Sequence, residues 1–220
     1  SYVVRRALCG LTAKNYNNVF LRIASQIQAN GASCASFLGT FGEADGDAVR
    51  FPNDAELSRQ ILERRQYGNI QQSRLRHILC ELEYAARDKF DESGSIPADL
   101  TIEHVLPDTW MEHWPLSDGT KVPADQRTGM AEPQLTLIAD REAVKHTLGN
   151  LTLLTDARNP SLSNLCFGIK RKALSKSLLK LNREIADLSA WTEESIRARA
   201  SRFAGLAIRI WPRAIDAKLI

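Results

Sequence analysis

Three side chains that lie far apart along the chain form a set suited to breaking a phosphodiester bond. Such a bond is a poor electrophile, so rapid hydrolysis needs an activated water and a cation that holds charge on the leaving oxygen. The neutral imidazole of His104 can take a proton from water near pH 7. The carboxylate of Glu103 and the carboxamide of Asn159 offer the hard oxygen ligands that suit Mg²⁺ or Mn²⁺.

The backbone must meet one condition for this chemistry. Adjacent residues of a strand point to opposite faces, so Glu103 and His104 can share one site only where a strand ends or bulges. Residues 100–106 have the pattern of a short strand, and Pro107 closes it because proline cannot donate to a ladder. Residues 148–154 form the second predicted strand.

The remaining chain is predicted to be mostly helical, which makes the fold class mainly α with a small β part. Apolar residues at helical spacing predict helices over 16–27, after Asn53, over 71–90, over 168–184 as one basic helix, and after Thr192. Residues 109–133 are expected to form a long irregular insertion. The helix-breaking stretch 91–100 divides the chain into a helical scaffold over 1–95 and a second subdomain over 96–220.

Charge is concentrated near the C-terminal end. Residues 157–213 contain twelve Lys and Arg against four Asp and Glu, a balance of +8; the chain's net charge is +3, so the rest carries −5. Such a block is typical of a protein that binds a phosphate backbone, and a solvated helix face is the alternative.

Composition excludes several other classes of protein. At 44% hydrophobic and 25% charged residues the chain can bury a core, and it has no apolar run near 18 residues. The four cysteines lie far apart, so we expect reduced thiols in a cytoplasm. Most of the four tryptophans are expected to pack in the core.

The strings TIEHVLP, HTLGNLTLLTDARN and NLCFGIK resemble the HNH nuclease signature in the variant found in the C-terminal part of GmrSD-type restriction enzymes. The likeness covers most of the chain and is most specific over 101–172. It implies a ββα-metal core of two strands and a helix around one divalent metal. The N-terminal residues resemble the segment that joins such nucleases to a nucleotide-hydrolysing sensor domain, so this chain is expected to be a piece of a longer protein.

The resemblance also implies roles for individual residues. Glu103 and Asn159 would be metal ligands, with Asn164 the alternative to Asn159, and His104 would be the general base. Asn150 would hold the loop or orient the base.

Two further positions match the family pattern. His146 would touch the scissile phosphate or brace the site, and Lys170 would contact phosphate. Each of these residues also has a purely structural alternative, such as a histidine bonded within the core.

The resulting hypothesis is a metal-dependent DNA endonuclease or nickase that serves in defence against foreign, often modified, DNA. It would have little sequence preference of its own. The alternatives are an inactive DNA-binding or regulatory module and an RNA nuclease. The DNA backbone is expected to contact a set of basic residues: Arg158, Arg171, Lys172, Lys176, Lys180 and Arg197.

Overall fold

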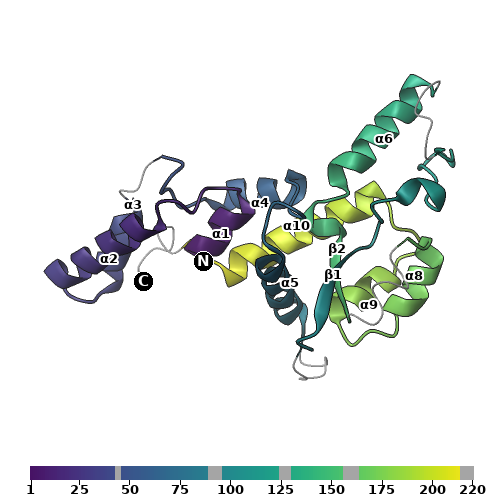
Figure 1. The fold of residues 1–220 in the computed structure, drawn as a ribbon. Coiled ribbons are helices and arrows are strands. Elements are labelled where there is room, and N and C mark those ends of the chain that lie inside the picture. Colours follow the sequence, from purple (N-terminus) through teal and green to yellow (C-terminus); the bar gives the residue numbers. More distant parts are fainter. Residues whose placement is uncertain (43–45, 89–95, 124–129, 156–163, 214–220) are drawn as a thin grey trace. The chain divides into compact units, whose positions relative to one another are not determined.

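The computed structural model describes residues 1–42, 46–88, 96–123, 130–155 and 164–213 (Figure 1). Its helices are α1 (Tyr2–Leu8), α2 (Tyr16–Asn30), α3 (Cys34–Gly42), α4 (Asp54–Glu63), α5 (Gln72–Ala86), α6 (Glu132–Val144), α8 (Phe167–Leu174), α9 (Lys180–Ala186) and α10 (Glu193–Ile210). The strands are β1 (Leu100–His104) and β2 (Leu151–Thr155), and the short 3-10 helices are η1 (Trp110–Glu112) and η2 (Leu148–Asn150). This confirms the mainly α fold with a small β part.

The chain forms two compact units. Unit 1 comprises Ser1–Gln60 with Ala207–Ile220, and unit 2 comprises Ile61–Leu206. The core of unit 1 is aromatic: Tyr2 packs against Phe41 and Phe51, with ring centroids 4.7 and 5.4 Å away. The buried Arg5 guanidinium donates to Asp54 at 2.6 Å. The division of the chain into residues 1–95 and 96–220 stays a prediction.

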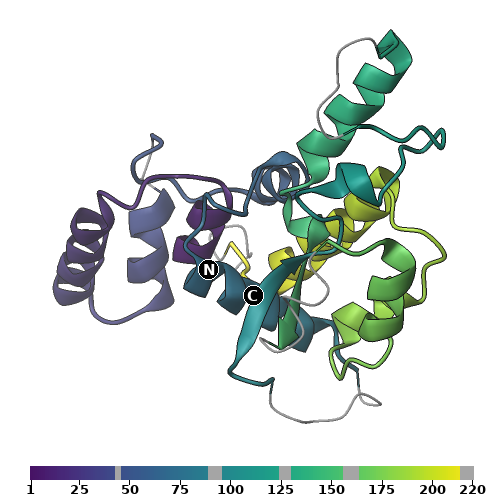
Figure 2. The same ribbon diagram turned by 45° about the vertical axis from the view of Figure 1, so that its right-hand side comes forward.

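The sheet of unit 2 positions the predicted site. β1 and β2 are antiparallel, with Glu103 opposite Thr152 and His104 opposite Leu151. The sheet lies between α5 on one side and the pair α8 and α9 on the other (Figures 1 and 2). Alternation along β1 directs Glu103 toward α8, where it meets a lysine, and His104 toward the opposite side.

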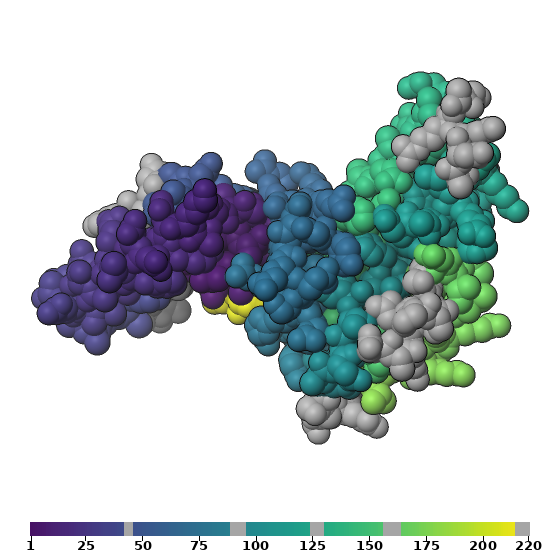
Figure 3. All heavy atoms as spheres, in the orientation of Figure 1, coloured from purple at the N-terminus to yellow at the C-terminus, as the bar shows by residue number. Residues whose placement is uncertain are grey.

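The insertion between the strands carries much of the hydrophobic core. Trp110 in η1 and Trp114 after it are buried with Ile138 and Val144 of α6 in one cluster. Figure 3 shows residues 100–123, in teal, and α6, in green, as one continuous surface. The expectation that tryptophans pack in the core is confirmed, since Trp191 and Trp211 are buried too.

The single basic helix predicted over 168–184 is wrong, because the chain forms two helices there, α8 and α9. The intervening Leu178, predicted to face inward, is 73% exposed. The buried carboxylate of Glu83 in α5 accepts the backbone N–H groups of Lys180 and Leu181, both at 2.9 Å. It thereby caps the first turn of α9 from a distant part of the sequence.

Two local predictions of helix starts are confirmed. Asn53 accepts the backbone N–H of Glu56 at 2.8 Å, and Thr192 accepts that of Ser195 at 3.2 Å. Among the helices of the described residues, none is both long and apolar enough to cross a membrane.

Gly149 lies in a space that admits no side chain. A Cβ there would come within 2.2 Å of the Ile196 carbonyl oxygen in α10, and backbone cannot move aside cheaply. We therefore expect Gly149→Ala to lower the free energy of unfolding by about 1–3 kcal/mol, measured by urea denaturation. Gly205→Ala is the matched control: its Cβ meets nothing within 4 Å, and inside α10 it should be neutral or stabilising. Equal effects of the two changes would contradict this packing argument.

Candidate active site

Asn150 ties the two strands together at the end of the sheet. Its buried Oδ1 accepts the Leu106 backbone N–H at 2.8 Å and the Trp191 indole N–H at 3.0 Å. Its Nδ2 donates to the carbonyls of Leu106 and Lys145 at 2.9 and 2.7 Å. The side chain is thus fully occupied with holding the backbone, in keeping with the loop-holding role that the resemblance implied.

A pair of imidazoles lies at the end of β1. His104 Nε2 is 3.0 Å from His146 Nδ1, and the ring of Tyr67 lies with its centroid 4.4 Å from that of His104. His146 follows α6, and its carbonyl accepts the backbone N–H groups of Gln66 and Tyr67. Its Nε2 lies 3.4 Å from Asp108 Oδ1. The result is a chain of three polar side chains, His104–His146–Asp108.

The hydrogen bonds of this chain assign the tautomers. With the His146 Nε2–H directed at the Asp108 carboxylate, His146 Nδ1 carries the lone pair and accepts from His104 Nε2–H. The lone pair of His104 is then on Nδ1. Burial lowers the pKa of His104 to about 3, and the neighbouring His146 lowers it further. Burial also lowers the pKa of His146, so both rings are neutral at pH 7.

This pKa predicts how the stability of the metal-free protein depends on pH. The ordinary pKa of His104 is 6.5, so between pH 6.5 and about 3 the unfolded chain binds a proton that the folded chain does not. The free energy of unfolding should therefore fall as the pH drops below 6.5, by roughly 1.4 kcal/mol per pH unit for one such proton. Urea denaturation in chelator between pH 7.5 and 5.5 measures the slope. His104→Gln should flatten it, and exposed His77→Gln should not.

A buried ion pair lies on the other side of β1. Lys170 of α8 places its Nζ 2.7 Å from Glu103 Oε1 and 2.7 Å from the His104 carbonyl oxygen. Burial raises the pKa of Glu103 and lowers that of Lys170, so the charged form of each depends on the other. The predicted phosphate contact of Lys170 is not formed by this arrangement, because the ammonium is buried against the sheet.

The predicted metal ligands are only partly placed. Glu103 supplies a carboxylate of the right kind, but one oxygen is held by Lys170, so a cation and the ammonium would compete for it. Asn159 lies outside the described residues. Asn164 is exposed, and its Oδ1 accepts the Thr109 hydroxyl at 2.8 Å. Among the described residues, no three His, Cys, Asp or Glu side chains are grouped to hold a metal. The choice between Asn159 and Asn164 stays a prediction.

The predicted DNA-contacting residues differ in their availability. Lys172 and Lys176, on α8 and just after it, are exposed. Arg171 is exposed as well, but its Nε donates to the Ala186 carbonyl at 2.7 Å. Lys180 pairs with Asp88 and Arg197 with Asp140, which partly neutralises both. Arg158 lies outside the described residues.

Charge reversal of the two exposed lysines should weaken DNA binding. We expect Lys172→Glu with Lys176→Glu to lower affinity most at low salt, because each lost phosphate contact releases fewer counterions. The slope of log affinity against log salt should become shallower by about two. Fluorescence anisotropy with a labelled duplex at several salt concentrations measures this. Lys14→Glu, a matched exposed control, should have a smaller effect, and an unchanged slope in the double variant would contradict the prediction.

Several contributors to the site were not anticipated from the sequence. Tyr67, Asp108 and Trp191 contact the predicted residues directly, and Lys145 pairs with Asp108 at 2.9 Å. Lys145 and Asp108 are near neighbours of His146 and of the strand end, which is a usable signal. Tyr67 and Trp191 are distant in sequence and only the fold identifies them.

A neutral imidazole chain beside a lysine–carboxylate pair, at the end of a two-stranded sheet, equips a domain for acid–base chemistry. The chain belongs to the family described as GmrSD restriction endonucleases, C-terminal domain, which it matches over residues 51–206. Membership implies a restriction nuclease function and a DNA substrate. Among curated proteins, none matches the chain.

Proposed function

We propose that this chain is the HNH-type nuclease part of a modification-sensing restriction protein and that it nicks DNA in a metal-dependent reaction. The His104–His146–Asp108 chain carries the proposal, because it supplies a base, a group that orients it and a counter-charge. A divalent ion, Mg²⁺ or Mn²⁺, would be held by Glu103 and Asn159. When bound, it would stabilise charge on the scissile phosphate and on the leaving 3′-oxygen.

His104 acts as the general base in this proposal. Its Nδ1 takes a proton from the attacking water, while its Nε2–H remains bonded to His146. The carboxylate of Asp108 then balances the positive charge through His146. A pKa of about 3 makes the ring neutral but weakly basic in the free protein. The negative phosphate of bound DNA raises it, so the ring becomes a stronger base when substrate is present.

The other residues hold and orient. Asn150 fixes the peptide that joins the two strands, through its bonds to Leu106. Lys170 holds Glu103 in place, and Lys172 and Lys176 follow the DNA backbone.

A supercoiled-plasmid assay tests the proposal. Nicked circles should accumulate with Mg²⁺ or Mn²⁺ and disappear with chelator. A structured RNA incubated in parallel separates DNA from RNA cleavage, since the same chemistry serves either backbone. Metal-independent cleavage by the purified chain would contradict the proposal.

The buried Glu103–Lys170 pair favours one alternative, a binding module without catalysis, because it occupies a predicted metal ligand. DNA binding without any metal-dependent nicking would support that alternative.

A further inference from the structure

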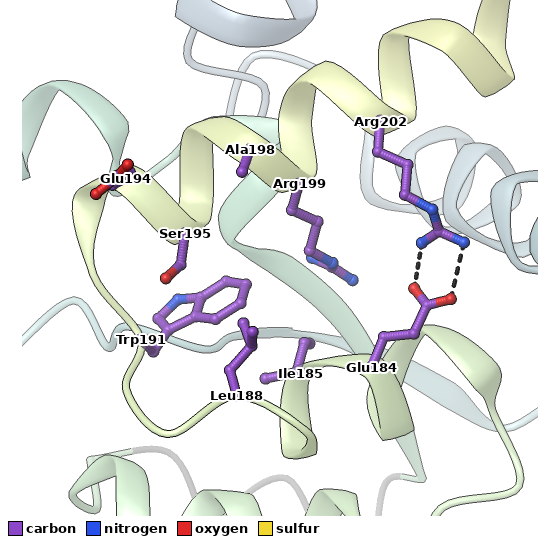
Figure 4. A pocket seen from close by; sticks show the side chains of 9 residues that line it. All are labelled: Glu184, Ile185, Leu188, Trp191, Glu194, Ser195, Ala198, Arg199 and Arg202. Atoms are coloured by element: carbon purple, nitrogen blue, oxygen red, sulfur yellow. Dashed lines mark hydrogen bonds and ion pairs between the residues drawn. The ribbon is translucent and has the colours of Figure 1, made fainter.

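A pocket of about 390 Å³ opens between α9 and α10, apart from the imidazole chain. Figure 4 shows the side chains that line it: Glu184, Ile185, Leu188, Trp191, Glu194, Ser195, Ala198, Arg199 and Arg202. Its walls are mainly apolar, and the paired Glu184 and Arg202 stand at one end. A pocket of this volume and composition has the size of a small-molecule site.

The guanidinium of Arg199 is only partly satisfied. Its Nη1 donates to the carbonyls of Gly149 and Leu151 at 2.8 and 2.7 Å. Within the part of the chain that the structure describes, its Nε and Nη2 are buried and have no hydrogen-bond partner. Burial lowers the pKa of Arg199 to about 9, which is the mark of a cation short of counter-charge. Unpaired donors of a buried charged group are costly and call for an acceptor.

The unpaired atoms define what that acceptor would be. Nε–H and Nη2–H point in parallel from one edge of the guanidinium, a spacing that matches the two oxygens of a carboxylate. Glu184 and Glu194 also line the pocket, so a single negative charge fits better than the double charge of a phosphate. The indole of Trp191 and the side chain of Ile185 offer surface for a flat apolar body.

We propose that this pocket binds a small monocarboxylate with a planar apolar body, anchored by Arg199. The proposal goes beyond the nuclease function and does not depend on it. The two unpaired groups are shielded from solvent, so the lining must shift to admit the carboxylate. Leu188 is the side chain best able to move, since it is 39% exposed whereas Ile185 and Trp191 are almost fully buried.

The position of the pocket links it to the candidate active site. Arg199 holds the carbonyls on either side of Asn150, and Trp191 donates to the Asn150 side chain. A ligand on these two side chains would therefore rest directly behind the peptide that joins the strands.

Fluorine NMR with two matched probes tests the proposal without DNA or metal. 4-(Trifluoromethyl)benzoate should bind the full chain, and neutral 4-(trifluoromethyl)benzamide should bind at least about tenfold more weakly, because it lacks the charge-assisted pair. Equal affinity for the two probes, or no binding of the benzoate, would overturn the proposal.

A pair of substitutions at the exposed Leu188 locates the binding. Leu188→Glu places a negative charge at the pocket and should weaken benzoate binding at least about tenfold, whereas the isosteric Leu188→Gln should retain most of it. Circular dichroism checks that both variants are folded. Unchanged benzoate affinity in Leu188→Glu would place the probe elsewhere and reject the site.

Discussion

Replacing His104 with alanine is expected to slow plasmid nicking by a factor of about 100 to 10,000, the usual contribution of a general base. The reason lies in its position: His104 is the end of the His104–His146–Asp108 chain and holds the lone pair that can accept a proton from water. DNA binding should persist, because the exposed lysines are on α8 and after it, away from this residue in sequence. Single-turnover nicking rates and duplex affinity, measured on the same preparations, separate the two effects.

Two further variants make the His104 result specific. His104→Gln keeps a side chain that can donate to His146 but cannot accept a proton as a base, so it should be folded and as inactive as the alanine variant. His77→Ala, at an exposed position of α5, should cleave at the normal rate. Full activity of His104→Gln would show that the ring is not the base. Loss of activity in His77→Ala would point to a general loss of folding.

The parts of the fold that follow local rules were predictable from the sequence. Asn53 and Thr192 cap helices with their own side chains, and the apolar spacing from Tyr16 to Ile27 shows directly in α2. The break between α8 and α9 was not predictable in this way. It depends on Glu83, nearly a hundred residues away, which satisfies the first backbone N–H groups of α9.

The candidate site divides along the same line. His104 and His146 were singled out by residue type and motif, and the fold brings them into contact at 3.0 Å. The sequence also singled out Glu103 and Lys170 but gave no sign that they pair with each other. Their pairing arises because alternation along β1 directs Glu103 toward α8. A linear pattern contains no information on which face of a short strand a later helix will cover.

The Glu103–Lys170 pair should produce the largest effects on stability. Removing one partner leaves the other charge buried and unpaired, so Glu103→Gln and Lys170→Met should each lower the free energy of unfolding by about 3–5 kcal/mol. The double variant leaves no buried charge at this place and should be clearly more stable than the sum of the two single effects predicts. Urea denaturation of the four proteins measures the coupling. Strict additivity would mean that the two groups do not depend on each other.

The same variants separate a holding lysine from a competing one. Because the ammonium occupies a Glu103 oxygen that a cation would need, Lys170→Met should bind Mn²⁺ more tightly than the unchanged chain, provided that it is folded. Glu103→Gln should bind Mn²⁺ weakly, since an amide carries no charge. Calorimetric titration at a temperature well below the unfolding transition gives both affinities. If Lys170→Met binds Mn²⁺ more weakly instead, the lysine organises the carboxylate for the metal, and its pairing with Glu103 is a support for the metal site rather than an obstacle to it.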